Sequence, residues 1–166
     1  MSTLPNAAAP VVLAVCLGNI CRSPTAEASL REAAAELGVE LDVRSAGTGA
    51  WHIGSAPDQR MRAAASEVGL DLDGRAQLAD APSLRDADLV LAMDRSNLRD
   101  LQRLADEEGV DTPIRLFREF DPEADGDLDV PDPYYGGPEG FATVVAMCRR
   151  TAVEVVARLD ELVVRP

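Results

Sequence analysis

Short apolar runs alternate with longer stretches of helical periodicity along most of the chain. The run Val11–Val15 is continuously apolar, as in a strand that is buried on both faces. We expect strands at residues 11–15, 41–46, 88–93 and 114–117. We expect helices at residues 25–37, 57–68, 96–108 and 141–164. This alternation predicts an α/β three-layer sandwich, in which a central four-stranded parallel sheet is flanked by helices on both faces.

Local signals mark the ends of these elements. Ser23 and Pro24 are typical of a helix start, with Ser23 as the capping residue, and Gly38 is typical of a helix end. Residues 47–54 and 121–138 read as irregular segments. Ligands bind at the carboxyl ends of the strands in sheets of this kind. The loop that follows Val15 is therefore the first place to look for a functional site.

Length and composition indicate one soluble domain. We expect a flexible leader at residues 1–10 and a single domain at 11–166, with no segment apolar enough to span a membrane. Sixteen basic and 29 acidic residues give a net charge of −13, which argues against binding to nucleic acid or to anionic lipid. All basic residues are Arg, which excludes lysine chemistry, and a single His, His52, excludes a two-His metal site. Three cysteines without a CxxC pair favour a reducing compartment, so we expect a cytoplasmic protein.

The loop after the first strand combines a thiol with features of an anion site. Cys16 stands where the strand ends, and Arg22 completes a Cys-x5-Arg run just before the helix. Backbone amides at a helix start face anions, and an Arg side chain matches two oxygens of a phosphate. Gly18 and Asn19 tolerate the positive φ that a tight loop requires. The loop therefore predicts a phosphate cradle with Cys16 at its floor.

The reactivity of such a thiol depends on how well its anion is stabilised. An ordinary cysteine has a pKa of about 8.5, and lowering it by about three units requires about 4 kcal/mol. A helix dipole supplies about 0.3–2 kcal/mol, so two or three hydrogen bonds to the anion are also needed. Loop amides and the Ser23 hydroxyl are the candidate donors, with Arg22 adding charge. Our hypothesis is that Cys16 is a thiolate nucleophile, and the alternative is a small buried core residue.

A second candidate segment ends in Asp132-Pro133-Tyr134-Tyr135. Asp132 could act as general acid and then as general base, and the tyrosines offer flat faces to an aromatic ligand. By composition alone, the segment is also typical of a solvated acidic loop. Its spacing from Asp121 onward fits a calcium loop only loosely, and Pro131 argues against the helix that should follow.

The runs VCLGNICRSPTAEA, RSAGT, WHIG, MDRSNLRDL and DPYYG, in this order, resemble the low-molecular-weight protein tyrosine phosphatase family. The resemblance implies the same sheet, no metal or organic cofactor, and hydrolysis of phosphotyrosine in protein substrates through a phosphocysteine. It implies that Cys16 is the nucleophile, that Arg22 binds phosphate and that Asp132 is the general acid and base. Other roles follow by position: a phosphate-binding loop of Leu17, Gly18, Asn19, Ile20, Cys21 and Ser23, loop support from Ser45, and a substrate rim of Trp51, Tyr134 and Tyr135.

Some alternatives remain open at this point. Cys21 is either a partner for a reversible disulfide with Cys16, as the family often shows, or a space-filling residue, whereas Cys148 is expected in the core. Two other functions fit the same loop: a thiol-dependent arsenate reductase, which needs further cysteines, and a non-enzymatic phosphotyrosine-binding module. The presence of Cys16, Arg22 and Asp132 together favours the phosphatase.

Overall fold

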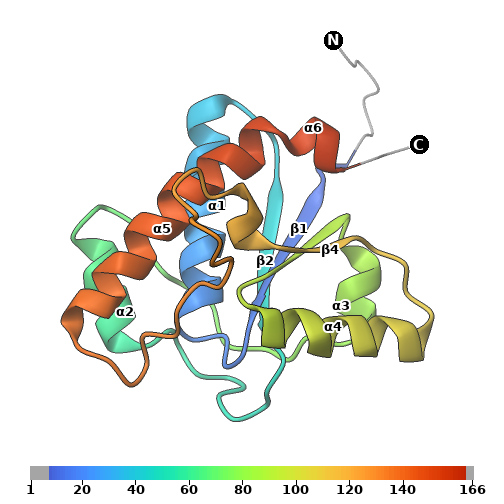
Figure 1. Cartoon of the computed structure of the whole chain (residues 1–166), viewed down its shortest axis with the longest axis horizontal. Helices are drawn as coiled ribbons and strands as arrows, with labels where there is room; N and C mark the ends of the chain where they lie inside the picture. Colours follow the sequence, from blue (N-terminus) through green and yellow to red (C-terminus); the bar gives the residue numbers. More distant parts are fainter. Residues whose placement is uncertain (1–7, 164–166) are drawn as a thin grey trace.

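A computed structural model describes residues 8–163 (Figure 1). The strands are β1 (Val11–Cys16), β2 (Asp42–Gly47), β3 (Leu89–Ala92) and β4 (Ile114–Leu116). The helices are α1 (Arg22–Leu37), α2 (Gln59–Ser66), α3 (Ala81–Asp86), α4 (Arg95–Glu108), α5 (Pro138–Ala157) and α6 (Leu159–Leu162), with a 3₁₀ helix, η1, at Phe117–Phe120. All strand pairs are parallel, in the order β2-β1-β3-β4. The predicted four-stranded parallel sheet is confirmed.

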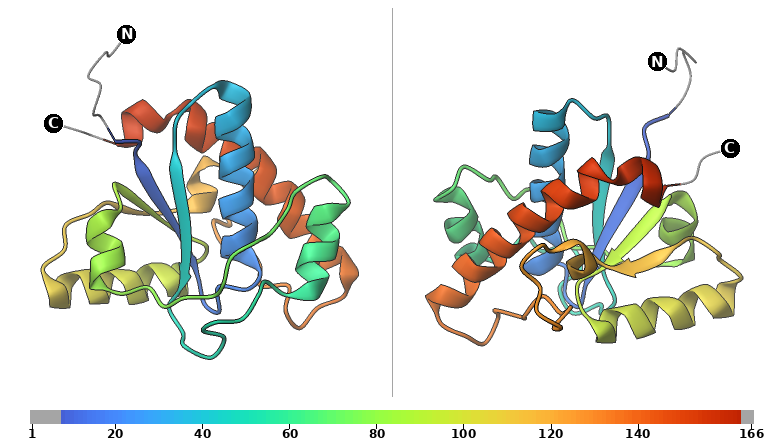
Figure 2. Two further views of the ribbon diagram at one scale, coloured as in Figure 1. Left: turned by 180° about the vertical axis from the view of Figure 1, so that it is seen from behind. Right: turned by 45° about the horizontal axis from the view of Figure 1, so that its top comes forward.

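Helices cover both faces of this sheet, as expected (Figure 2). Alternate residues of β1 point to opposite faces. Val12 and Ala14 join a core formed with α1, α2 and α5, whereas Leu13 and Val15 join a second core formed with α3 and α4. Leu101 of α4 is fully buried in this second core. Because β1 is central, its last residue, Cys16, emerges at the middle of the carboxyl edge of the sheet.

The start of α1 differs from the sequence expectation. The helix begins at Arg22 with Cys21 as its N-cap, so Ser23 lies in the first turn and is not the cap. The physical reason is that the Ser23 hydroxyl is used elsewhere, since it contacts Cys16 Sγ and accepts a hydrogen bond from the Asn19 side chain. Gly38 ends the helix in the left-handed conformation, as predicted.

The C-terminal half shows further differences. The expected helix at 141–164 is two helices, because the backbone leaves the helical region at Arg158 (φ −106°, ψ 13°), and residue 164 lies outside the described residues. α5 starts earlier than expected because Pro138 occupies its first turn, where proline is favourable. β4 stops at Leu116, where the chain turns into η1. The short helix α3 was missed, although Asp80 and Ser83 form a capping box at its start.

A buried carboxylate joins η1 to α5. Asp121 accepts hydrogen bonds from Arg150 (2.7 and 3.0 Å) and Arg118 (2.9 Å), and its side chain is fully buried. Burial alone would raise the pKa of Asp121, but the two Arg side chains lower it to about 2. Asp121 is also the first residue of the loose calcium-loop pattern, and its carboxylate is already bound by these two Arg side chains.

Replacement of Asp121 by Asn is expected to reduce stability in a pH-dependent way. The folded-state pKa of Asp121 lies below its ordinary value of 3.8, so its charge stabilises the protein above about pH 4 and loses this effect as pH falls toward 2. We expect Asp121→Asn to lower the free energy of unfolding by about 2 kcal/mol at pH 6 and by about half as much near pH 3. Urea unfolding at both pH values measures this difference. A loss that does not change with pH would contradict it.

Candidate active site

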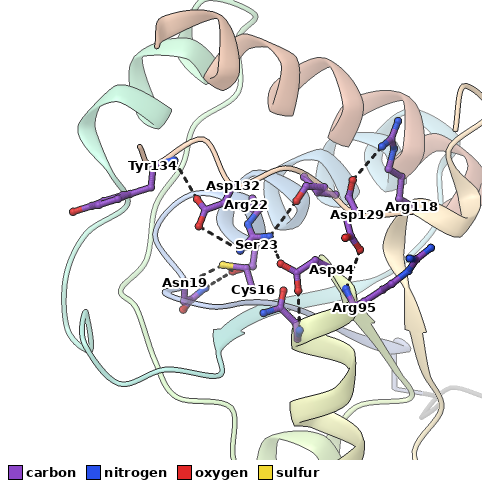
Figure 3. Close-up of polar contacts among 12 residues, drawn as sticks. Cys16, Asn19, Arg22, Ser23, Asp94, Arg95, Arg118, Asp129, Asp132 and Tyr134 are labelled. Atoms are coloured by element: carbon purple, nitrogen blue, oxygen red, sulfur yellow. Dashed lines mark hydrogen bonds and ion pairs between the residues drawn. The ribbon is translucent and has the colours of Figure 1, made fainter. Parts of the chain in front are cut away.

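The loop between β1 and α1 folds around the Cys16 sulfur (Figure 3). The backbone N–H of Asn19 donates to Cys16 Sγ at 3.2 Å, and Ser23 Oγ lies 3.0 Å from the same sulfur. Asn19 has a φ of 57°, as expected, but Gly18 does not have a positive φ. Gly18 instead lies close to the segment after β2, because a Cβ at this position would come within 3.0 Å of the His52 ring. The segment that follows β2 therefore packs against the loop.

Asn19 is the centre of a buried hydrogen-bond network. Its Nδ2 donates to Ser23 Oγ at 2.8 Å and to Ser45 Oγ at 3.0 Å, and its Oδ1 accepts the backbone N–H of Gln77 at 3.0 Å. Ser45 in turn donates to Glu27 at 3.0 Å. Because Asn19 donates to Ser23 Oγ, the Ser23 hydroxyl hydrogen can be donated to the Cys16 sulfur at 3.0 Å or to the Ala46 carbonyl at 3.4 Å. The structure therefore brings Ser45 against Asn19, as expected.

Arg22 lies almost completely buried beside the sulfur. Its NH1 donates to Asp94 Oδ2 at 2.6 Å and to the Val130 carbonyl at 3.1 Å, and its NH2 lies 3.7 Å from Asp132 Oδ2. Burial by itself lowers the pKa of Arg22, but Cys16, Asp94 and Asp132 outweigh burial and raise it. Arg22 is therefore a permanent cation that is held in one orientation by groups from two separate segments, Asp94 after β3 and the segment of Val130 and Asp132.

Asp132 reaches the site from the irregular segment before α5. Val130 anchors this segment, since its N–H donates to the Met93 carbonyl at 2.8 Å and its carbonyl accepts from Arg22. The backbone N–H of Tyr134 donates to Asp132 Oδ1 at 3.1 Å. The Asp132 side chain is 42% exposed, so it can exchange a proton with water while it faces the Arg22 guanidinium.

These groups line a pocket of about 410 Å³. The lining residues come from the Cys16 loop, the segment after β2 and the Asp132 segment: Cys16, Leu17, Gly18, Ile20, Cys21, Arg22, Trp51, His52, Asp132, Tyr134 and Tyr135. The expected rim residues therefore all meet at this pocket. Trp51 is 74% exposed and Tyr135 is 93% exposed, so flat aromatic surface surrounds the opening. Within residues 8–163, no three His, Cys, Asp or Glu side chains are grouped to hold a metal ion.

The other two cysteines have different surroundings. Cys21 is a buried free thiol in the same loop, and burial, together with Asp58, Cys16 and Asp132, raises its pKa to about 12. Cys148 is fully buried on α5, as expected for a core residue, and burial raises its pKa to about 12 as well. Both side chains are therefore neutral thiols at neutral pH, whereas Cys16 Sγ accepts the Asn19 N–H and lies within hydrogen-bond distance of Ser23 Oγ.

Sequence reasoning missed several residues that hold the site together. Asp94 is the partner of Arg22, and it also caps α4 through a 2.7 Å hydrogen bond from the Asn97 N–H. Its position at the carboxyl end of β3 was an available signal, because residues there face the same edge of the sheet as Cys16. Glu27 and Gln77 carried no such signal, because they reach Asn19 and Ser45 through tertiary contacts alone.

A known protein family matches nearly the whole chain. The family model described as low molecular weight phosphotyrosine protein phosphatase matches residues 11–164. The chain belongs to this family. It is 44% identical over 152 residues to a low molecular weight protein-tyrosine-phosphatase of Streptomyces coelicolor, covering 90% of this chain and 93% of that relative. Membership makes the chain a cysteine-dependent protein tyrosine phosphatase rather than either alternative weighed from the sequence.

Solved structures agree with this membership. The chain is similar to the crystal structure of a protein tyrosine phosphatase from Entamoeba histolytica, with a TM-score of 0.86 and 31% identity over 92% of this chain and 98% of that chain. It is also similar to a Drosophila protein described as an arginine phosphatase, with a TM-score of 0.82 and 28% identity over 90% and 97%. This phosphatase fold therefore also occurs in a protein named for a different phosphorylated residue. No helix within residues 8–163 is long and apolar enough to cross a membrane.

Proposed function

We propose that this phosphatase hydrolyses phosphotyrosine in protein substrates, with Cys16 as nucleophile, Arg22 as phosphate-binding residue and Asp132 as general acid and base. The observation that supports this most is the convergence of Cys16 and Arg22, from the loop between β1 and α1, and of Asp132, from the segment before α5, on one pocket. The pocket also lies at the N-terminus of α1, where the helix dipole favours a bound anion.

In the first step, the Cys16 sulfur attacks phosphorus in line with the ester bond. The S–P bond forms, the bond from phosphorus to the tyrosine oxygen breaks, and protonated Asp132 gives its proton to the leaving phenolate. The transferring phosphoryl group carries its charge on its equatorial oxygens. Arg22 can stabilise that charge without reorganisation, because Asp94 and the Val130 carbonyl already hold its guanidinium in place.

In the second step, water attacks the phosphocysteine on the side that the phenol has left. Asp132, now a carboxylate, takes a proton from this water as the O–P bond forms and the S–P bond breaks. The products are inorganic phosphate and the Cys16 thiolate. The partial exposure of Asp132 suits this step, because water must reach the same carboxylate.

The pocket walls favour an aryl ester as the substrate. Leu17 and Ile20 are apolar, and Trp51, Tyr134 and Tyr135 offer aromatic faces. Among the described lining residues, Asp132 is the only carboxylate, so the guanidinium of a phosphoarginine would find few anionic partners. A cytoplasmic location is also part of the proposal, since a reactive Cys16 and two other free thiols suit a reducing compartment.

Peptides that differ only in the phosphorylated residue test the substrate class. We expect kcat/KM for a phosphotyrosine peptide to exceed that for the matched phosphoarginine peptide by about 10²-fold, because an aromatic ring fills the apolar pocket and a guanidinium does not. Release of inorganic phosphate measures both rates. Equal rates, or faster hydrolysis of phosphoarginine, would contradict the proposed substrate.

A further inference from the structure

The first residues of α2 connect the phosphate-binding loop to the segment that carries Asp132. The backbone N–H of Asp58, the N-cap of α2, donates to the Ile20 carbonyl at 2.8 Å, so the start of the helix is fixed to the loop itself. Asp58 accepts hydrogen bonds from Arg60 Nε at 3.2 Å and from Arg60 NH2 at 3.0 Å. The Arg60 guanidinium is therefore held at a set place beside the pocket.

Beyond Asp58, the Arg60 guanidinium meets two aromatic rings. Its central carbon lies 5.2 Å from the centre of the Tyr134 ring and 4.8 Å from the centre of the Phe141 ring. Phe141 lies in the first turns of α5 and is buried, so it provides a fixed surface. Tyr134 follows Asp132 by two residues and donates its N–H to the Asp132 carboxylate. Figure 1 shows α2 beside the start of α5, and Figure 3 shows Tyr134 next to Asp132.

The segment between Val130 and α5 has few other polar ties to the rest of the protein. Among the described residues, its polar links are the long ion pair from Asp132 to Arg22 at 3.7 Å and the contacts of Tyr134 with Arg60 and His52. The hydrogen bond from Gly136 to Pro133 lies within the segment. Pro133 is buried and Tyr134 packs against the core, so apolar contacts also hold the segment. The contact of Arg60 with Tyr134 is the restraint that connects the segment to α2 and, through Asp58, to the phosphate-binding loop.

We propose that Arg60 is a positioning residue for the general acid. By bridging the Tyr134 ring to the fixed Phe141 ring, it keeps the Asp132 carboxylate over the pocket, where it can protonate the leaving oxygen. This inference rests on the proposed role of Asp132. A direct role of Arg60 in attracting phosphate is disfavoured, because Asp58 already neutralises its charge through two hydrogen bonds.

The dependence of rate on the leaving group distinguishes positioning of an acid from a general structural role. A weakly basic leaving group, such as p-nitrophenolate, departs with little help, whereas phenolate needs the proton. We expect Arg60→Met to lower kcat/KM for phenyl phosphate roughly three- to tenfold and to leave that for p-nitrophenyl phosphate within about twofold. Arg60→Lys, which keeps a cation near the rings but loses the fork to Asp58, is expected to be intermediate.

Arg62 provides the matched control. It lies on the same helix and is exposed, and its side chain forms no hydrogen bond or ion pair within residues 8–163, so Arg62→Met should leave kcat/KM for both substrates unchanged. In an Asp132→Asn background, Arg60→Met should have no further effect on phenyl phosphate, because the acid that it positions is gone.

The outcomes separate this inference from the proposed function. Equal losses of kcat/KM for both substrates in Arg60→Met, or losses that multiply with those of Asp132→Asn, would overturn the positioning role. If Asp132→Asn itself shows no dependence on the leaving group, the assignment of Asp132 as general acid fails instead. A thermal unfolding scan of each variant confirms that rates are compared between folded proteins.

Discussion

Replacement of Cys16 by serine is expected to abolish hydrolysis of p-nitrophenyl phosphate. A serine hydroxyl ionises far less readily than a thiol, and within residues 8–163 no carboxylate or imidazole forms a hydrogen bond with the side chain at position 16. The change removes the nucleophile, so no phosphoenzyme forms. Release of p-nitrophenolate measures the loss.

Two controls test whether the loss of activity comes from the nucleophile alone. Cys16→Ser should still bind inorganic phosphate or vanadate, because Arg22 and its partners Asp94 and Val130 are untouched, and calorimetry measures that binding. Cys21→Ser removes a thiol from the same loop but should retain most activity, since that thiol is neutral and buried. Substantial turnover by Cys16→Ser would mean that the nucleophile lies elsewhere.

Replacement of Asp132 by asparagine is expected to have the second largest effect. The amide keeps the shape of the side chain and can still accept the hydrogen bond from the Tyr134 N–H, but it cannot transfer a proton. We expect kcat/KM for phenyl phosphate to fall by about 10²–10⁴-fold. The loss should be smaller for p-nitrophenyl phosphate, whose leaving group needs less assistance, whereas kcat should fall for both because the second step also needs Asp132.

Asp125→Asn is the matched control for this change. Asp125 is an exposed carboxylate in the same acidic segment, and it is not among the described residues that line the pocket. Its replacement removes one negative charge and should leave both rates near the wild-type values. If Asp125→Asn and Asp132→Asn lower the rates equally, the effect of Asp132 is one of charge and not of proton transfer.

The sheet and the position of the Cys16 loop were predictable because their signals are local. A continuous apolar run predicted β1, and the spacing of Cys16 and Arg22 before a helix predicted that both would meet at the end of that strand, where the structure places a pocket. The positive φ of Asn19 could be predicted for the same reason, since few residue types adopt this conformation. Resemblance to the family then pointed to Asp132 as the proposed general acid, which composition alone could not separate from a residue of a solvated loop.

The parts that escaped prediction depend on tertiary contacts. Ser23 has every local feature of a helix cap, but contacts with Cys16 and Asn19 draw its hydroxyl into the loop. Asp94 and Arg60 each act through a residue far away in the sequence, namely Arg22 and Tyr134. The break at Arg158 is a change of backbone conformation within an apolar pattern that continues on both sides. Periodicity and motif spacing carry no information of this kind.

Alkylation of Cys16 tests the central claim, which is that the loop makes this sulfur the reactive nucleophile of a phosphate-binding pocket. In the Cys21→Ser variant, the remaining thiol besides Cys16 is the fully buried Cys148, so loss of activity with iodoacetate reports on Cys16. We expect iodoacetate to inactivate this variant at neutral pH several times faster than it alkylates free cysteine, and bound phosphate to protect against inactivation. Inactivation no faster than the alkylation of free cysteine, and not slowed by phosphate, would contradict the account.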